Sequence, residues 1–258
     1  MLTKRKIVPN IAGSFQKIIG ILQALILAGF GVHALAESDF IAVGRFSSAA
    51  PGDALPYGWE PLEFKKIQRH TRYTLVQDDG RVVLKAVSEQ SASGLAKRVR
   101  IDPREFPIID WQWKVGNILS KGDAYKKEGD DYPARIYITF EYDGSRVGFF
   151  GRIKYKALRS MLGRYPPLGV VTYIWGSKAP VGTMVKNAFS DQVAMFVIKS
   201  GPQNLYTWYN ERRNVYEDYK RAFGREPTNI SGVVIMTDSD NTGQSATAFF
   251  GDITFRKN

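Results

Sequence analysis

Polar and apolar side chains alternate with a period of two along the segment Arg135–Tyr142. One set of alternate positions is Ile136, Ile138, Phe140 and Tyr142, and the other is Arg135, Tyr137, Thr139 and Glu141. This alternation predicts a strand with one face in the core and one polar face. Two other segments, Val193–Lys199 and Gly232–Thr237, are apolar at nearly every position, which predicts central strands of a packed sheet.

Short β-rich segments separated by turn residues occupy much of the remaining chain. Further strands are predicted at Ile41–Phe46, Tyr73–Gln77, Arg81–Ser88, Gly94–Ile101, Ile108–Val115, Val170–Trp175 and Ala246–Phe255. The tripeptide Asp78-Asp79-Gly80 lies between two of them and is a strong hairpin signal. The segment Ser48–Pro61 is rich in Gly and Pro, and we expect it to be a loop.

Helical periodicity is clear in one segment, Glu211–Phe223, where apolar residues recur at the spacing of one helix face. Asn210 can cap its start and Gly224 its end. A weaker helical pattern runs from Lys154 to Leu162. Many strands and one amphipathic helix predict an all-β fold, a two-sheet antiparallel β-sandwich resembling a jelly roll. No linker or internal repeat divides residues 37–258, so we expect one domain.

The first 36 residues have the layout of a secretory signal peptide. Lys4, Arg5 and Lys6 precede an apolar run, and Ala34-Leu35-Ala36 supplies the small residues of a cleavage site. The alternative is a retained membrane anchor, but the uninterrupted apolar run is short for a membrane span. We expect cleavage after Ala36 and an exported, periplasmic mature chain.

Composition narrows the chemistry of the mature chain. The full chain has no cysteine, 36 Lys and Arg, and 25 Asp and Glu; removing the four leader bases leaves 32 against 25, a net charge of +7. These bases are interleaved with acids, so the sequence does not indicate nucleic-acid binding. His70 is the only histidine after residue 36. Thiol catalysis, thiolate metal sites and histidine-rich zinc sites are therefore excluded.

Two acidic segments are the main candidates for a site. GDDYPARIYITF places Asp130 and Asp131 just before a strand that begins with Arg135 and carries Tyr137 on its polar face. Such a group fits sugar binding, metal binding or acid–base chemistry, or simply turn capping and a surface ion pair. TDSDNTG places Asp238, Asp240 and Asn241 after a buried strand. It matches only the opening of a calcium loop, so a structural calcium at Asp238 and Asp240 and a plain Asx-rich loop both remain open, and no other cofactor is expected.

Aromatic residues give further candidates. Trp111 and Trp113 share one face of a predicted strand and favour core packing over a sugar-stacking surface. Trp175, beside Gly176, fits either role. Arg213 fits a surface ion pair with Glu217 or a turn toward a pocket. The predicted ligand-binding set is Asp130, Asp131, Arg135, Tyr137, Trp175, Arg213, Asp238, Asp240 and Asn241.

Several long motifs together resemble the DUF3047 family of exported bacterial proteins. They are GDDYPARIYITF, TYIWG (Thr172–Gly176), RRNVYEDYKRAFGREP (Arg212–Pro227), VVIMTDSDNTG (Val233–Gly243) and FFGDITF (Phe249–Phe255). The resemblance implies an exported protein of unknown activity and no catalytic residue. The pattern is also similar in outline to jelly-roll modules that bind carbohydrate, an analogy of fold alone.

Three functions remain open at this point. The first is a binding module for a glycan or another cell-envelope ligand. The second is a structural or assembly partner in the envelope without a small ligand. The third is a polysaccharide-acting enzyme that pairs Asp130 or Asp131 with Asp238 or Asp240. We expect no nucleic-acid partner and no membrane contact after cleavage, and the oligomeric state stays undetermined.

Overall fold

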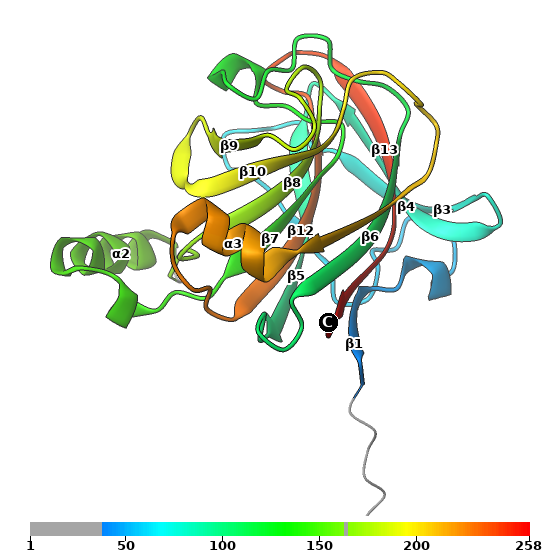
Figure 1. Ribbon diagram of the computed structural model, residues 1–258. Helices are drawn as coiled ribbons and strands as arrows, with labels where there is room; N and C mark the ends of the chain where they lie inside the picture. The colour runs from blue at the N-terminus through cyan, green and yellow to red at the C-terminus, as the bar shows by residue number, and fades with distance from the viewer. Residues whose placement is uncertain (1–37, 163–164) are drawn as a thin grey trace, which may run out of the picture. The chain divides into compact units, whose positions relative to one another are not determined.

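Two β-sheets lie face to face across a common core in the computed structural model, which describes residues 38–162 and 165–258 (Figure 1). The predicted leader, residues 1–36, lies outside the described residues. Six strands form the first sheet: β1 (Phe40–Gly44), β3 (Arg72–Asp78), β4 (Arg81–Glu89), β6 (Ile108–Val115), β11 (Tyr209–Asn214) and β13 (Ser245–Arg256). Their order is β11-β6-β13-β4-β3, and β1 pairs with one end of β13.

The second sheet has seven strands in the order β2-β5-β12-β7-β8-β10-β9. They are β2 (Glu60–Leu62), β5 (Ala92–Ile101), β7 (Arg135–Phe140), β8 (Val170–Gly176), β9 (Met184–Asn187), β10 (Ser190–Ser200) and β12 (Ile230–Asp238). The predicted two-sheet β-sandwich is confirmed. One detail differs, because β8 and β10 pair in parallel and make this sheet mixed. Their connection passes through β9, which then pairs antiparallel with β10.

The turn of the predicted hairpin shows why the sequence marked it so clearly. Asp79 and Gly80, between β3 and β4, have φ values of +47° and +78°. Two successive positive φ values match the twist of a tight hairpin, and Asp followed by Gly tolerates them. The register of β3 and β4 is fixed by this turn.

The described residues contain two α-helices, α2 (Phe149–Leu162) and α3 (Val215–Phe223), with short 3-10 turns at Phe46–Ser48, Lys127–Gly129 and Gly144–Arg146. The predicted helix Glu211–Phe223 is correct only in its second part. Its first residues belong to β11, so the side chain that caps α3 is Asn214, which accepts a hydrogen bond from the Glu217 N–H at 3.0 Å. Neither helix of the described chain has the apolar length needed to cross a membrane.

Large rings fill the space between the sheets. Trp111 and Trp113 are 1% and 0% exposed, which confirms their predicted core position. From the opposite sheet, Tyr173 stacks on Trp111 at 4.9 Å between ring centroids. At the open side of the sandwich, Tyr219 of α3 packs on Phe140 at 4.3 Å. Ile136, Ile138 and Phe140 are fully buried, so the predicted core face of that strand is confirmed.

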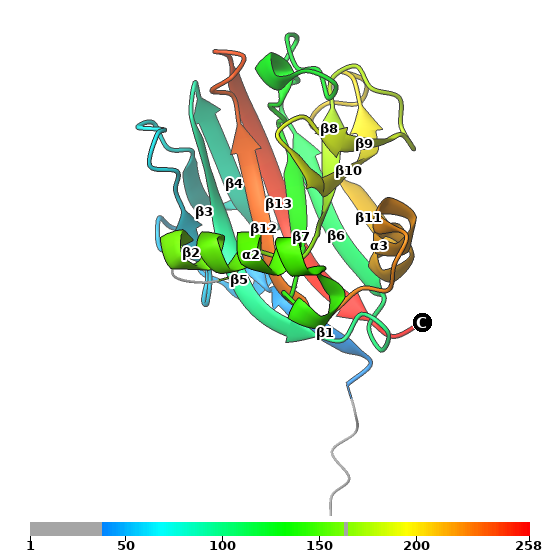
Figure 2. The ribbon, with the colours of Figure 1, turned by 90° about the vertical axis from the view of Figure 1, so that its left-hand side faces the viewer.

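A second, smaller apolar cluster lies on the outer side of the seven-stranded sheet. It includes Tyr132, Ile174 and Met195, and Ala124 of the loop before β7 packs into it. Figure 2 shows this loop above the upper ends of β7 and β8. The covering loop explains why acidic residues close to its end are buried.

Candidate functional site

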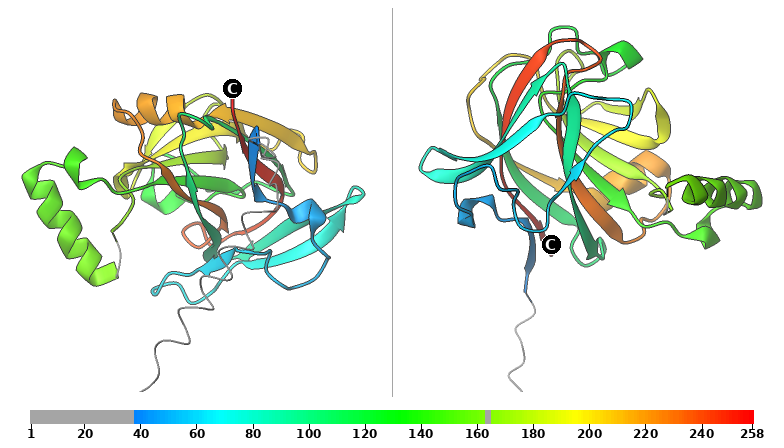
Figure 3. Two further views of the ribbon diagram at one scale, coloured as in Figure 1. Left: turned by 90° about the horizontal axis from the view of Figure 1, so that it is seen from below. Right: turned by 180° about the vertical axis from the view of Figure 1, so that it is seen from behind.

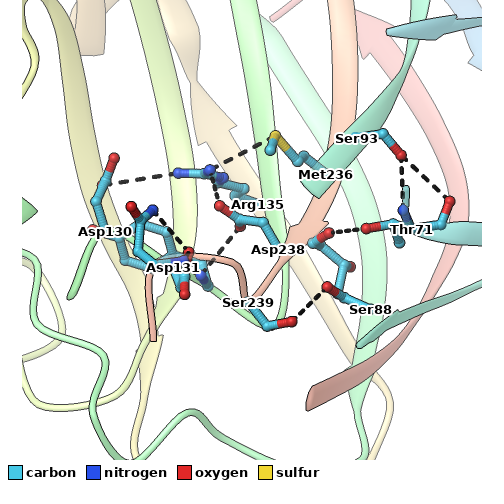
Figure 4. Close-up of polar contacts among 12 residues, drawn as sticks. Thr71, Ser88, Ser93, Asp130, Asp131, Arg135, Met236, Asp238 and Ser239 are labelled. Atoms are coloured by element: carbon cyan, nitrogen blue, oxygen red, sulfur yellow. Dashed lines mark hydrogen bonds and ion pairs between the residues drawn. The ribbon is translucent and has the colours of Figure 1, made fainter. Parts of the chain in front are cut away.

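Seven of the predicted site residues lie together, where β7 begins and β12 ends. Figure 4 labels four of them, Asp130, Asp131, Arg135 and Asp238. The guanidinium of Arg135 donates through Nη2 to Oδ2 of Asp238, and its Nη1 lies 3.9 Å from Oδ1 of Asp130. The rings of Tyr132 and Tyr137 lie 5.1 and 5.2 Å from the same guanidinium. Arg135 is therefore the centre of a buried network that joins neighbouring strands.

Asp131 fixes the loop that follows β12. Its Oδ1 accepts hydrogen bonds from N and Nδ2 of Asn241 at 3.3 and 3.1 Å, and its Oδ2 accepts from the Thr242 N–H at 2.6 Å. Asp130 similarly accepts from Nδ2 of Asn187, at the end of β9. The two carboxylates therefore hold together three segments that are distant in sequence.

The titration of this network follows from its burial. Burial raises the pKa of Asp238 well above its ordinary value; Arg135 opposes this shift, and the charges of Asp131 and Asp130 add to it. Burial acts to lower the pKa of Arg135, but the carboxylates of Asp238 and Asp130 raise it overall, so the guanidinium stays cationic. Burial also raises the pKa of Tyr132 and of Tyr137.

The geometry of the acidic cluster does not suit a calcium ion. One carboxylate oxygen each from Asp131, Asp238 and Asp240 lies within 4.8 Å of the others. However, Asp238 already pairs with a guanidinium and accepts the Tyr132 N–H, and both oxygens of Asp131 accept N–H groups. A dication would have to displace these donors beside a fixed positive charge. The same engagement argues against a hydrolytic pair, since Asp131 and Asp238 are 0% and 1% exposed.

Two predicted site residues lie elsewhere. Trp175 is 1% exposed and packs in the core against Trp113 and Tyr209, so its ring offers no surface on which a sugar could stack. Arg213 pairs with Asp218, which also accepts a hydrogen bond from the Tyr173 hydroxyl at 2.9 Å. The predicted partner of Arg213, Glu217, instead lies 3.7 Å from Lys220.

A second polar group, absent from the predicted set, covers the outer side of the six-stranded sheet. At its centre the half-buried Trp208 donates through Nε1 to Oδ2 of Asp78 at 2.7 Å. The guanidinium of Arg81 lies 4.4 Å from the Trp208 ring, and Nζ of Lys114 lies 5.1 Å from it. Lys114 also lies 4.8 Å from the half-buried ring of Phe249.

Planar hydrogen-bonding groups continue from this centre toward β11. Gln112 accepts a hydrogen bond from Arg81 and donates through Nε2 to Oδ1 of Asn210 at 2.7 Å. In the next row Arg212 binds both carboxylate oxygens of Asp110 at 2.6 and 3.1 Å, and Arg256 donates to Asp110 at 2.7 Å. The name "Trp208 face" is used below for Asp78, Arg81, Asp110, Gln112, Lys114, Trp208, Asn210, Arg212, Phe249 and Arg256.

The Trp208 face is hollowed. A depression of about 460 Å³ is lined by Asp110, Gln112, Asn210, Arg212 and Arg256 with Asp252 and Thr254. A second depression, of about 410 Å³, lies on the same side of the sheet between β3 and β4, where Lys85 and Arg72 line it. Lys85, which lines the second depression, lies 5.8 Å from the ring of Phe249, which belongs to the Trp208 face.

Electrostatics keep the centre of the Trp208 face ordered. Partial burial acts to raise the pKa of Asp78, but hydrogen bonds from Lys114 and Trp208 lower it overall. Asp78 is therefore ionised at neutral pH, and it orients the indole N–H and the ammonium group at the same time. A ring held in this way is pre-organised for a ligand.

The sequence contained a signal for the Trp208 face, but the predicted helix Glu211–Phe223 overlapped it. The segment Tyr209–Asn214 alternates, with Asn210 and Arg212 outward and Glu211 inward, where it accepts from Trp113 Nε1 at 3.3 Å. Glu and Arg are good helix formers, and the true helix begins directly afterwards. The alternation beginning at Trp208 was the signal for an edge strand.

These features define a β-sandwich protein with a hollowed polar and aromatic sheet face. The chain belongs to the DUF3047 family, described as a protein of unknown function, which it matches over residues 57–254. This confirms the family resemblance. No curated protein matches the chain in sequence.

Solved structures with a similar fold are distant. One is a family 11 carbohydrate-binding module of a Clostridium thermocellum cellulase, at 8% identity and a TM-score of 0.41, covering 86% of this chain and 97% of that one. Another is the carbohydrate recognition domain of Emp47p, at 10% identity and a TM-score of 0.41, covering 86% and 96%. A third is the K1 adhesin domain of Lys-gingipain from Porphyromonas gingivalis W83, at 9% identity and a TM-score of 0.37, covering 86% and 99%. Likenesses this distant assign no ligand.

Proposed function

We propose that this protein is an exported binding module that recognises a glycan through the Trp208 face. The observation that carries the proposal is the depression lined by Gln112, Asn210, Arg212 and Asp110. Arg81 joins it to the half-buried Trp208 ring, because it lies over that ring and donates a hydrogen bond to Gln112. Planar amide, guanidinium and carboxylate groups can each bind two neighbouring hydroxyls, and an indole face packs on the C–H face of a sugar ring. This combination on an ordered sheet supports sugar recognition.

This proposal places the glycan site on the six-stranded sheet, whereas the predicted residues other than Arg213 lie on or beside the seven-stranded sheet. The Arg135 network supplies rigidity, because its carboxylates are buried and engaged. The Trp208 face supplies groups that a ligand can reach, since Asn210, Arg212 and Arg256 are exposed. In this proposal the buried Arg135 network stabilises the fold, and the exposed Trp208 face binds the ligand.

Replacing Trp208 by Ala is expected to weaken glycan binding tenfold or more, because buried aromatic anchors dominate such contacts. The protein used is Glu37–Asn258, since both sheets and the core lie within Asp39–Asn258. An array of neutral and acidic envelope glycans first identifies a glycan that the wild type binds. Titration of that glycan into the wild type and the variants then measures the affinity. Tyr57→Ala, at a tyrosine that is 97% exposed outside the Trp208 face, is the matched control and should bind like the wild type. Absence of any glycan ligand, or unchanged binding by Trp208→Ala, would refute the proposal.

Export is part of the proposal, and it is supported by the charged, apolar and small-residue layout of positions 1–36. Expression of the full chain in a Gram-negative host is expected to give a periplasmic protein whose amino terminus is Glu37. N-terminal sequencing of the fractionated protein makes the measurement. A protein that keeps its first residues and sediments with the inner membrane would instead establish the retained anchor.

A further inference from the structure

The segment between Asp143 and Asp191 has an unusual charge. Residues Gly144–Ser190 contain eight Lys and Arg and no Asp or Glu, whereas the whole chain has 36 bases and 25 acids. Helix α2 (Phe149–Leu162) lies in this segment and holds four of the eight bases. An acid-free stretch of this length attracts anionic partners over a distance of several ångströms.

Among the described side chains of α2, the exposed apolar and basic ones form two adjacent stripes, and the exposed Ser160 lies within the apolar stripe. Phe149, Ile153 and Ala157 recur at every fourth residue, and the first two are 69% and 53% exposed. The second stripe, Arg152, Lys156 and Arg159, is also exposed. Residues three and four apart share a helix face, so an apolar stripe runs beside a basic one. This layout is typical of helices that lie in the surface of an anionic membrane.

Among the described side chains of α2, the buried Tyr155 attaches the helix to the rest of the domain, and Arg159 also lies 4.8 Å from the Tyr165 ring. Tyr155 is 4% exposed, stacks on Tyr142 at 4.5 Å, and accepts a hydrogen bond from Nε2 of Gln192 at 2.7 Å. The backbone of the helix stands away from both sheets in Figure 1 and in both views of Figure 3. A helix of this length is marginal in water by itself, so a further surface would stabilise it.

We propose that α2 docks on an anionic lipid surface. Phe149 and Ile153 enter the boundary of the acyl chains, while Arg152, Lys156 and Arg159 lie at the level of the headgroup phosphates. The helix lies along the surface, consistent with its being too short to span a bilayer. This inference departs from the expectation that the mature chain has no membrane contact. It does not depend on the proposed glycan site, which uses other side chains.

The test is sedimentation of Glu37–Asn258 with vesicles of phosphatidylglycerol and phosphatidylcholine, and with phosphatidylcholine alone. We expect binding only to the anionic vesicles, and weaker binding in high salt. The triple variant Arg152→Glu, Lys156→Glu, Arg159→Glu should bind at least tenfold more weakly, because each base contributes about fivefold at such a surface. Ile153→Asp should also lose tenfold or more, because an apolar side chain no longer enters the lipid.

The control is a charge-matched triple variant at exposed bases outside α2, Lys65→Glu, Lys66→Glu, Arg98→Glu, which should keep binding within about threefold. If it loses as much as the α2 variant, net charge alone drives binding and the proposal is wrong. Equal sedimentation with both vesicle types, or no sedimentation of the wild type, also overturns it. The single variant Lys156→Glu, at an exposed position, keeps the test valid if the triple variant fails to fold.

Discussion

Replacing Asp238 by Ala is expected to lower the free energy of unfolding by about 3–5 kcal/mol, the usual cost of leaving one member of a buried ion pair alone. Asp238 is 1% exposed and Arg135 is 5% exposed. After the substitution the nearest carboxylate to the guanidinium is Asp130, at 3.9 Å. The Tyr132 N–H also loses its acceptor. Denaturant unfolding of Glu37–Asn258, monitored by tryptophan fluorescence, measures the change.

Asp240 provides the matched control for Asp238. It lies in the same acidic group but is half-buried, and burial together with the charge of Asp131 raises its pKa. Asp240 lies outside the ion pair of Arg135 with Asp238 and is only half-buried, and Asn keeps the size and polarity of its side chain, so Asp240→Asn should cost less than about 1 kcal/mol. If both variants lose the same free energy of unfolding, the ion pair between Arg135 and Asp238 does not stabilise the fold more than an ordinary polar contact does.

A double replacement separates charge from packing. If the cost of Asp238→Ala comes from an unpaired guanidinium, the double variant Arg135→Met, Asp238→Leu should recover part of the loss, because neither partner is then charged. Recovery of at least about 1 kcal/mol relative to Asp238→Ala is expected. A double variant less stable than Asp238→Ala would mean that the two side chains are needed mainly for shape.

Local signals in the sequence predicted most of the fold. The alternation at Arg135–Phe140 and the Asp79-Gly80 turn each depend on neighbouring residues, so both were readable without tertiary information. The short edge strands β2 and β9 were missed because each has only three or four residues and gives too few alternations to detect. The parallel pairing of β8 and β10 depends on chain topology, which no local pattern encodes.

The candidate site was harder to predict for a different physical reason. The predicted ligand-binding set included Asp131, Asp238 and Asp240, and the structure brings these three carboxylates together. Their burial was not predicted, since it comes from the loop whose Ala124 packs near Tyr132. Asp78, Gln112 and Trp208 come from three separate segments, and only the strand order β11-β6-β13-β4-β3 brings them onto one surface. Residues of this kind carry no shared motif.

Trp175 shows why aromatic residues in a sandwich need the structure before a role is assigned. Its indole Nε1 donates to the Gly201 carbonyl at 3.2 Å, and its ring contacts Trp113 at 6.0 Å and Tyr209 at 5.6 Å. Trp113 and Tyr209 belong to the six-stranded sheet, so both ring contacts are made across the core. Trp175, at the end of a strand and beside a glycine, therefore packs in the core.

Trp175→Ala is therefore expected to reduce the free energy of unfolding by about 3–5 kcal/mol through cavity formation, whereas Trp208→Ala should cost about 1 kcal/mol. Glycan affinity should respond in the opposite way. Without denaturant, at a temperature where both variants are folded, Trp175→Ala should bind the glycan within about threefold of the wild type, whereas Trp208→Ala should bind it at least about tenfold more weakly. Trp175→Phe, which keeps a ring but loses the Nε1–H donor, should fall between wild type and Ala in stability. If Trp175→Ala keeps wild-type stability and loses the ligand, the core assignment of Trp175 is wrong and the binding surface must be placed on the seven-stranded sheet.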